Sequence, residues 1–165
     1  GIEPVLYWYN PNIHPYTEYK ARRDTLKEYA KSINVQAIFE EEYGLKEFCK
    51  NVIPDLKNRC SNYCYKVRLE QTVKYAKENG YDSFTTTLFV SPYQQHDKLI
   101  EICEELSKKY DINFLYPNFQ NCIVHVPSTL AHTANNAHMH MLQNVPSELH
   151  FLPYFFRKVL LLQLY

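Results

Sequence analysis

The sequence predicts an α/β protein, a three-layer sandwich in which a mostly parallel β-sheet carries helices on both faces. Three observations favour this class. Short apolar runs alternate with longer amphipathic segments along residues 1–119, as they do in a series of β-α-β units. The 165 residues suffice for one domain with a core and are too few for two ordinary ones. Hydrophobic residues make up 45% of the chain and charged residues 22%, which is typical of a globular protein.

The predicted elements follow the order β-α-β-α-α-β-α-β. Runs rich in β-branched and aromatic residues predict four strands, at residues 5–9, 35–39, 84–90 and 112–116. Apolar residues at helical spacing among charges predict four helices, at residues 17–32, 45–52, 60–79 and 93–109. Pro54 and Gly80 mark the ends of the second and third helices, since neither residue continues a helix well.

Residues 120–165 differ in composition from residues 1–119. They contain five of the seven histidines, no glycine, and only three charged residues, Glu148, Arg157 and Lys158. No helical or alternating apolar pattern organises them. We therefore expect two parts: an α/β domain over residues 1–119, and a tail over residues 120–165 that is foreign to this fold and is out of frame or poorly ordered.

Charge and hydropathy argue against a protein that binds nucleic acid through an overall basic charge and against one that spans a membrane. The formal net charge is zero and the pI is about 7.2, so a contact with nucleic acid needs a local basic patch. No apolar run approaches the length needed to cross a bilayer, and the longest candidate, residues 159–164, is far too short. No secretory signal is recognised, and we expect a cytoplasmic protein.

The loops that follow the first and third strands are the expected binding loops. In parallel sheets the ligand site lies beyond the carboxyl ends of the strands. Residues 10–15 follow the first strand, and residues 91–92 follow the third. Both segments are polar and contain proline, which is equally the chemistry of an ordinary turn.

Residues 57–68 combine two cysteines with four cations and no acid. If this segment is an α-helix, Cys60, Cys64 and Arg68 repeat every four residues and share one face. Thiolates bind metals, and nearby cations should lower the pKa of the two thiols. The alternative is a pair of ordinary thiols on a solvated basic helix, because two ligands do not make a metal site.

Three motifs, in the same order and spacing, resemble the QueH-type epoxyqueuosine reductase family over residues 1–119. The first runs from Tyr9 to Pro15 (YNPNIHP) and continues with Tyr19 and Arg22–Arg23. The second motif consists of Arg59-Cys60, Cys64-Tyr65 and Arg68-Leu69-Glu70. The third is FTTTL at residues 84–88, followed by Ser91-Pro92.

The resemblance implies an iron–sulfur enzyme that reduces epoxyqueuosine to queuosine in tRNA, with an electron donor that the sequence does not identify. It implies a Rossmann-like fold of the adenine-nucleotide-hydrolase type and a [4Fe–4S] cluster with Cys60 and Cys64 among its ligands. The substrate-binding candidates are Asn10, Asn12, His14, Arg68, Thr86 and Ser91. The tRNA-contact candidates are Arg22, Arg23, Lys57, Arg59 and Lys66. Tyr9 and His14 are candidates for protonating the leaving oxygen.

The sequence departs from the family pattern at three places. An N-terminal pair of cysteines and a C-terminal Cys-Gly-Cys are absent, and the middle pair is spaced C-x3-C where the resemblance leads us to expect C-x2-C. Cys49, Cys103 and Cys122 match no family ligand. We therefore expect a fold incomplete at both ends, without the first, central strand, and a chain that neither assembles the cluster nor turns over epoxyqueuosine.

Two other functions remain open. A nucleotide-binding domain of the ATP-pyrophosphatase type would share this architecture, but three glycines cannot build its Gly-rich phosphate loop. A zinc-binding structural module would use Cys60, Cys64 and histidines of the tail such as His138 and His140.

Overall fold

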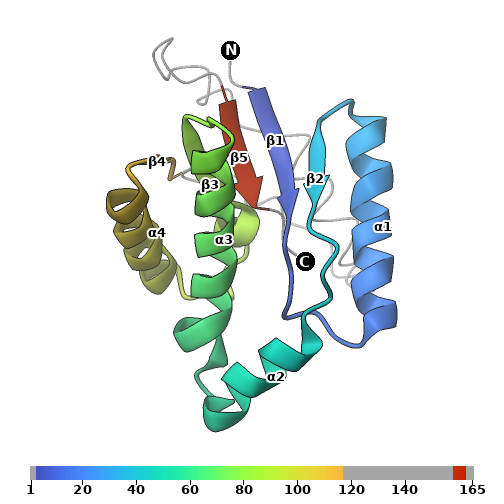
Figure 1. The fold of residues 1–165 in the computed structure, drawn as a ribbon, viewed down its shortest axis with the longest axis vertical. Coiled ribbons are helices and arrows are strands. Elements are labelled where there is room, and N and C mark those ends of the chain that lie inside the picture. The colour runs from blue at the N-terminus through green and yellow to red at the C-terminus, as the bar shows by residue number, and fades with distance from the viewer. Residues whose placement is uncertain (1–2, 117–157, 163–165) are drawn as a thin grey trace.

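The computed structural model describes residues 3–116 and 158–162. They form a five-stranded sheet in the order β2-β1-β5-β3-β4. All four pairs of neighbouring strands run parallel. The predicted α/β class is confirmed (Figure 1), while the Rossmann-like assignment stays a prediction.

The structure contains each predicted helix and strand, several with shifted ends, and one further strand. The strands are β1 (Glu3–Trp8), β2 (Ala37–Phe39), β3 (Ser83–Thr86), β4 (Asn113–Phe114) and β5 (Lys158–Leu162). The α-helices are α1 (Tyr16–Ser32), α2 (Leu45–Val52), α3 (Tyr65–Glu78) and α4 (His96–Tyr110). Short helical turns lie at Ile53–Asp55 (3-10), Cys60–Cys64 (π) and Thr87–Val90 (3-10). No helix in the described part of the chain combines the length and apolarity needed to span a bilayer.

Alternate residues of β1 face the two sides of the sheet, as strand geometry requires. Val5 and Tyr7 belong to a core cluster built with α3 and α4. Leu6 and Trp8 belong to a second cluster built with α1. Helices therefore cover both faces, and the three-layer prediction is confirmed.

The central strand comes from the segment that the sequence analysis set apart. β5 lies between β1 and β3, with Leu160 opposite both Val5 and Phe84. Leu160 is fully buried in the larger core cluster. Residues 158–162 of the predicted tail thus take part in the sheet, between the two strands where we expected none. The expected boundary at residue 119 lies outside the described residues and stays a prediction.

The third predicted strand extends too far. β3 ends at Thr86, whose Oγ1 accepts a hydrogen bond from the Leu88 N–H at 3.2 Å. This bond caps a 3-10 turn that takes the chain off the sheet. The β-branched run therefore supplies a strand and then a turn.

Candidate functional site

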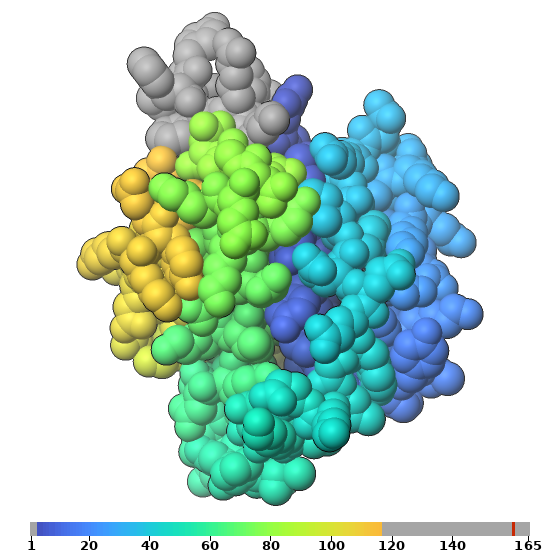
Figure 2. All heavy atoms as spheres, viewed as in Figure 1, coloured from blue at the N-terminus to red at the C-terminus, as the bar shows by residue number. Residues whose placement is uncertain are grey.

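The cysteine segment lies at the carboxyl end of the sheet. The arrowheads of β1 and β5 point to the end of the molecule where α2 lies (Figure 1). The loop after β1 and the turn after β3 leave the sheet at that end, because the strands are parallel. In the space-filling view, α2 lies beside the start of α3 there (Figure 2). The two predicted binding loops and the cysteine segment therefore share one end of the sheet.

Packing through α2 joins the loop after β1 to the cysteines. The Phe48 ring lies 4.7 Å from the His14 ring and 6.3 Å from the Tyr63 ring, centroid to centroid. Cys64 is buried in the same small cluster as Phe48, and Cys49 packs against it. Phe48 of α2 is thus close to the His14 ring and belongs to the same buried cluster as Cys64.

The cysteine pair lies on a π turn, not on the α-helix that the sequence predicts. The Tyr65 N–H donates to the carbonyl oxygen of Cys60, five residues earlier. The regular α-helix begins only at Tyr65. The prediction of one continuous helix over residues 60–79 is therefore wrong in its first turn, where the hydrogen-bond register holds one residue more than an α-helix does.

Burial, not charge, controls the Cys64 thiol. Cys64 is 3% exposed. Burial raises its pKa, the neighbouring Cys60 raises it further, and Arg68 and Arg59 act in the opposite direction. We expected nearby cations to lower the pKa of the thiols. For Cys64 the loss of hydration outweighs the attraction of the two guanidinium groups.

Arg68 is a buried cation without a carboxylate partner among the described residues. Its side chain is 4% exposed, and its Nε and Nη2 atoms are buried without a hydrogen-bond partner. Burial lowers its pKa to about 10, while Cys64, Tyr65 and Cys60 act in the opposite direction. The group stays charged at neutral pH, and unsatisfied buried donors cost roughly 1–3 kcal/mol. The site is therefore electrostatically complementary to an anion.

The loop after β3 is tied to the start of α3. The Tyr65 hydroxyl donates to Gln94 Oε1 at 2.8 Å, and the Gln95 N–H donates to the Tyr65 hydroxyl at 3.4 Å. In the same loop, Ser91 accepts at its carbonyl oxygen from His96 Nε2 at 2.9 Å. Thr86 is buried, and its hydroxyl is engaged by the turn described above. The loop that contains Ser91 is therefore attached to Tyr65 through Gln94 and Gln95, whereas the Thr86 hydroxyl bonds to the backbone.

The loop after β1 places two titratable side chains at the site. His14 Nδ1 shares a 2.8 Å hydrogen bond with the Tyr43 hydroxyl, and His14 Nε2 is buried without a partner in the described part of the chain. Burial lowers the pKa of His14. Tyr9 is half-buried, and burial, followed by the charges of Tyr63 and of nearby glutamates, raises its pKa. Asn10 is buried, and Asn12 is partly buried.

The predicted tRNA contacts fall into two groups. Lys57, Arg59 and Lys66 are exposed on the segment from α2 to the first turn of α3. Arg22 and Arg23 lie on α1, where they pair with Glu18 and Asp24.

Among the described residues, Cys49 and Cys103 do not complete a metal centre with Cys60 and Cys64. Cys103 is fully buried in the core, and burial raises the pKa of its thiol. Cys122 and the histidines of the tail lie outside the described residues, so the zinc hypothesis stays a prediction. Within residues 3–116 and 158–162, no group of three or more His, Cys, Asp or Glu side chains is arranged to hold a metal ion.

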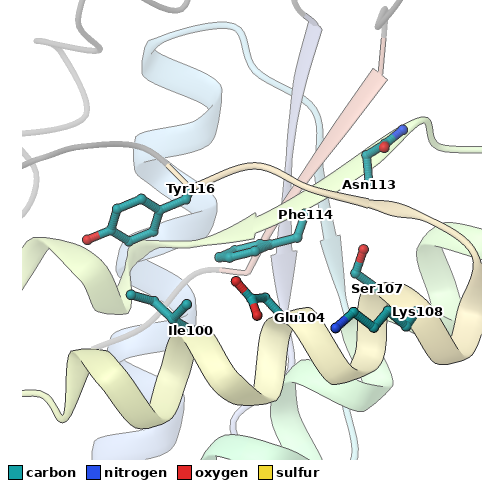
Figure 3. A pocket seen from close by; sticks show the side chains of 7 residues that line it. All are labelled: Ile100, Glu104, Ser107, Lys108, Asn113, Phe114 and Tyr116. Atoms are coloured by element: carbon teal, nitrogen blue, oxygen red, sulfur yellow. The ribbon is translucent and has the colours of Figure 1, made fainter.

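A pocket of about 410 Å³ lies elsewhere, between α4 and the edge strand β4. Figure 3 shows Phe114 and Tyr116 above the α4 side chains Ile100 and Glu104. None of the predicted site residues lines it. It therefore lies apart from the predicted site residues.

Sequence reasoning missed three residues that build the site. Phe48, Tyr65 and Tyr43 hold Cys64, the loop after β3 and His14 in place, respectively. Tyr65 was within the CY motif, whereas Phe48 and Tyr43 carried no sequence signal beyond being aromatic. Their roles depend on contacts between segments far apart in the chain.

Comparison with known proteins gives one consistent family. The family model described as Epoxyqueuosine reductase QueH matches residues 1–150. A relative named Epoxyqueuosine reductase QueH from Dehalococcoides mccartyi is 35% identical over 120 residues, which covers 73% of this chain and 65% of the relative.

Two further relatives carry the same name. The protein from Helicobacter pylori is 32% identical over 120 residues, 70% of this chain and 32% of the relative. The protein from Thermotoga maritima is 31% identical over 123 residues, 70% of this chain and 63% of the relative. The chain therefore spans less than two thirds of the length of each of these three relatives.

Proposed function

Since the chain belongs to the epoxyqueuosine reductase QueH family, we propose that it is part of an iron–sulfur enzyme that reduces epoxyqueuosine to queuosine in tRNA. The observation that supports this most is the arrangement of Cys60, Cys64 and Arg68. Two cysteines lie on one helical turn near the buried guanidinium of Arg68, whose Nε and Nη2 have no hydrogen-bond partner among the described residues. The segment lies at the carboxyl end of a parallel sheet, where α/β proteins bind their ligands.

Cys60 and Cys64 are the right type of ligand for an iron–sulfur cluster, but two thiolates are fewer than such a cluster needs. Such clusters are held by thiolates, four of them for a [4Fe–4S] cluster. We propose that Cys60 and Cys64 supply two of the four and that Arg68 offsets their negative charge. When bound, the cluster would supply electrons that no side chain can deliver repeatedly. Because the described residues offer only two such thiols together, we expect no cluster assembly and no turnover by the 165-residue chain alone.

The reaction needs two electrons and two protons. Removing the oxygen of an epoxide leaves an alkene, and the oxygen departs as water. His14 Nε2 and the Tyr9 hydroxyl lie in the loop after β1 and are the proposed sources of a proton. We propose that Asn10, Asn12 and Ser91 help to orient the substrate from the two loops, and that Thr86 shapes the floor beneath them. We propose tRNA as the partner and the cytoplasm as the location, with the electron donor unassigned.

The ligand assignment is testable in a chimera in which residues 3–116 replace the matching segment of the Dehalococcoides mccartyi relative. After anaerobic reconstitution, Cys64→Ala should lose most of the bound iron and the absorbance near 400 nm that iron–sulfur proteins show. The matched control is Cys103→Ser, at a fully buried cysteine on α4. Equal iron content in the Cys64→Ala chimera and its parent would show that Cys64 is not a ligand.

A further inference from the structure

The π turn at Cys60–Cys64 holds one residue more than a turn of α-helix. Its closing bond joins the Tyr65 N–H to the Cys60 carbonyl oxygen, five residues back, where an α-helix bonds four residues back. Single π turns inside helices are rare and are frequent at functional sites. Here the extra residue lies between the two cysteines of the candidate site.

The extra residue turns Cys60 toward the buried side of α3. The buried residues of α3 are Tyr65, Arg68, Leu69, Thr72, Val73 and Ala76. At about 100° per residue, a continuous α-helix would place Cys60 about 150° around the axis from the centre of that face. Because the π turn accommodates one extra residue in the same turn, Cys60 lies only about 50° from that centre. The observed burial agrees, since Cys60 is partly buried and packs against the core cluster, whereas Arg59 is exposed.

The same shift aligns Cys60 with Arg68. In a continuous α-helix, residues eight apart differ by about 80° around the axis, whereas residues seven apart differ by about 20°. With the extra residue absorbed, Cys60 takes the place of a residue seven before Arg68 and three before Cys64. Both cysteines and Arg68 then lie within about 60° around the axis, compared with about 80° in a continuous α-helix, and Cys60 lies on the side nearer the core.

We propose that the π turn is a positioning device, whose extra residue aligns the Cys60 and Cys64 thiols with the Arg68 guanidinium so that the pair holds one thiophilic, anionic group. The identity of that group rests on the proposed function, but the alignment does not. The buried Nε and Nη2 of Arg68, which lack partners in the described part of the chain, support an anionic occupant.

Two variants separate the π turn from simple sequence spacing. Asn62 is exposed, and its Nδ2 donates to Asp55 Oδ2 at 2.8 Å. Its backbone N–H donates to the Asn58 carbonyl oxygen at 3.0 Å, a bond that the deletion also removes. Deletion of Asn62 leaves C-x2-C on a continuous α-helix. The double variant Cys60→Ser with Ser61→Cys also has C-x2-C, but it keeps the extra residue.

The probe is phenylarsine oxide. Its trivalent arsenic forms two As–S bonds with a close pair of thiols, and its oxygen leaves as water with the two thiol protons, without a change of oxidation state. Peptide mapping identifies the bridged pair, which separates Cys60–Cys64 from pairs that include Cys49. Circular dichroism checks that each variant is folded.

We expect the deletion variant to bind the arsenical within about threefold of the unmodified chain, and the shifted pair to bind at least about tenfold more weakly, a difference of roughly 1.4 kcal/mol. A folded deletion variant that loses the bridge, or a shifted pair that binds as well as the native one, would overturn the proposal. If the deletion variant does not fold, the full-length shifted pair decides alone. No iron, sulfide or tRNA enters this assay, so its outcome is independent of the proposed function.

Discussion

Leu160→Ala tests the most unexpected element of the fold, the central strand β5. Leu160 is fully buried, and it lies opposite Val5 on one side and Phe84 on the other. Removing a buried leucine side chain to alanine costs about 2–5 kcal/mol, more where the surroundings cannot collapse into the cavity. Neighbouring strands on both sides restrict that collapse, so we expect a loss of about 3–4 kcal/mol in the free energy of unfolding.

The measurement is urea unfolding followed by tryptophan fluorescence. Trp8 is the only tryptophan, and it is fully buried on β1, beside β5 in the sheet. The matched control is Leu56→Ala, at a leucine that is 61% exposed, and it should change the free energy by less than about 0.5 kcal/mol. If Leu160→Ala also costs less than that, residues 158–162 do not form the centre of the sheet in solution.

Two further predictions concern the cations and the histidine of the site. Lys57, Arg59 and Lys66 are exposed, so a tRNA complex that engages all three should lose affinity with a slope of log affinity against log salt near −2, at roughly 0.7 per phosphate. Lys66→Ala should weaken binding, and Lys74→Ala, an exposed change further along α3, should not; equal effects would exclude a local basic face. Because burial lowers the pKa of His14, the unfolded chain takes up its proton first, and stability falls as the pH drops through about 6.5. His14→Gln should therefore reduce the difference in unfolding free energy between pH 7.5 and pH 5.5, and an unchanged difference would refute this.

Local patterns were enough to predict most of the helices and strands. The helix at residues 45–52 has the predicted ends, because apolar spacing and Pro54 both act within a few residues. The strand at residues 84–90 was half right, since β-branched residues favour extended backbone but do not determine where a strand leaves its sheet. The end was decided by one side-chain hydrogen bond of Thr86.

The central strand was not predicted although its pattern is in the sequence. A parallel strand buried on both faces is a continuous apolar run, and residues 159–162 are such a run. As a membrane segment, residues 159–164 are too short. The role of the run depends on pairing with β1 and β3, each more than 70 residues away in the chain. No local pattern carries that information.

The cysteine segment shows how linear spacing can mislead even where the site is correctly located. C-x3-C with Arg68 four residues further on suggested one face of an α-helix, but the π turn changes the register within the motif itself. Spacing counts residues, whereas the position of a side chain around the axis depends on which carbonyl each N–H finds. The residue types identified the site, and the hydrogen-bond register determined its geometry.

The burial of Arg68 joins the stability of the fold to its function. A leucine or methionine at this position would pack in the same place without leaving guanidinium N–H groups unsatisfied, and such replacements are often neutral or stabilising. Natural sequences break local rules of this kind mainly at functional sites. The charge has a use if an anionic group completes the hydrogen bonds of Arg68 Nε and Nη2, which are buried without partners in residues 3–116 and 158–162. Binding of that group would then stabilise the folded chain, and more so the higher its affinity. The same cation therefore lowers the stability of the fold when the site is empty and raises it when the group is bound.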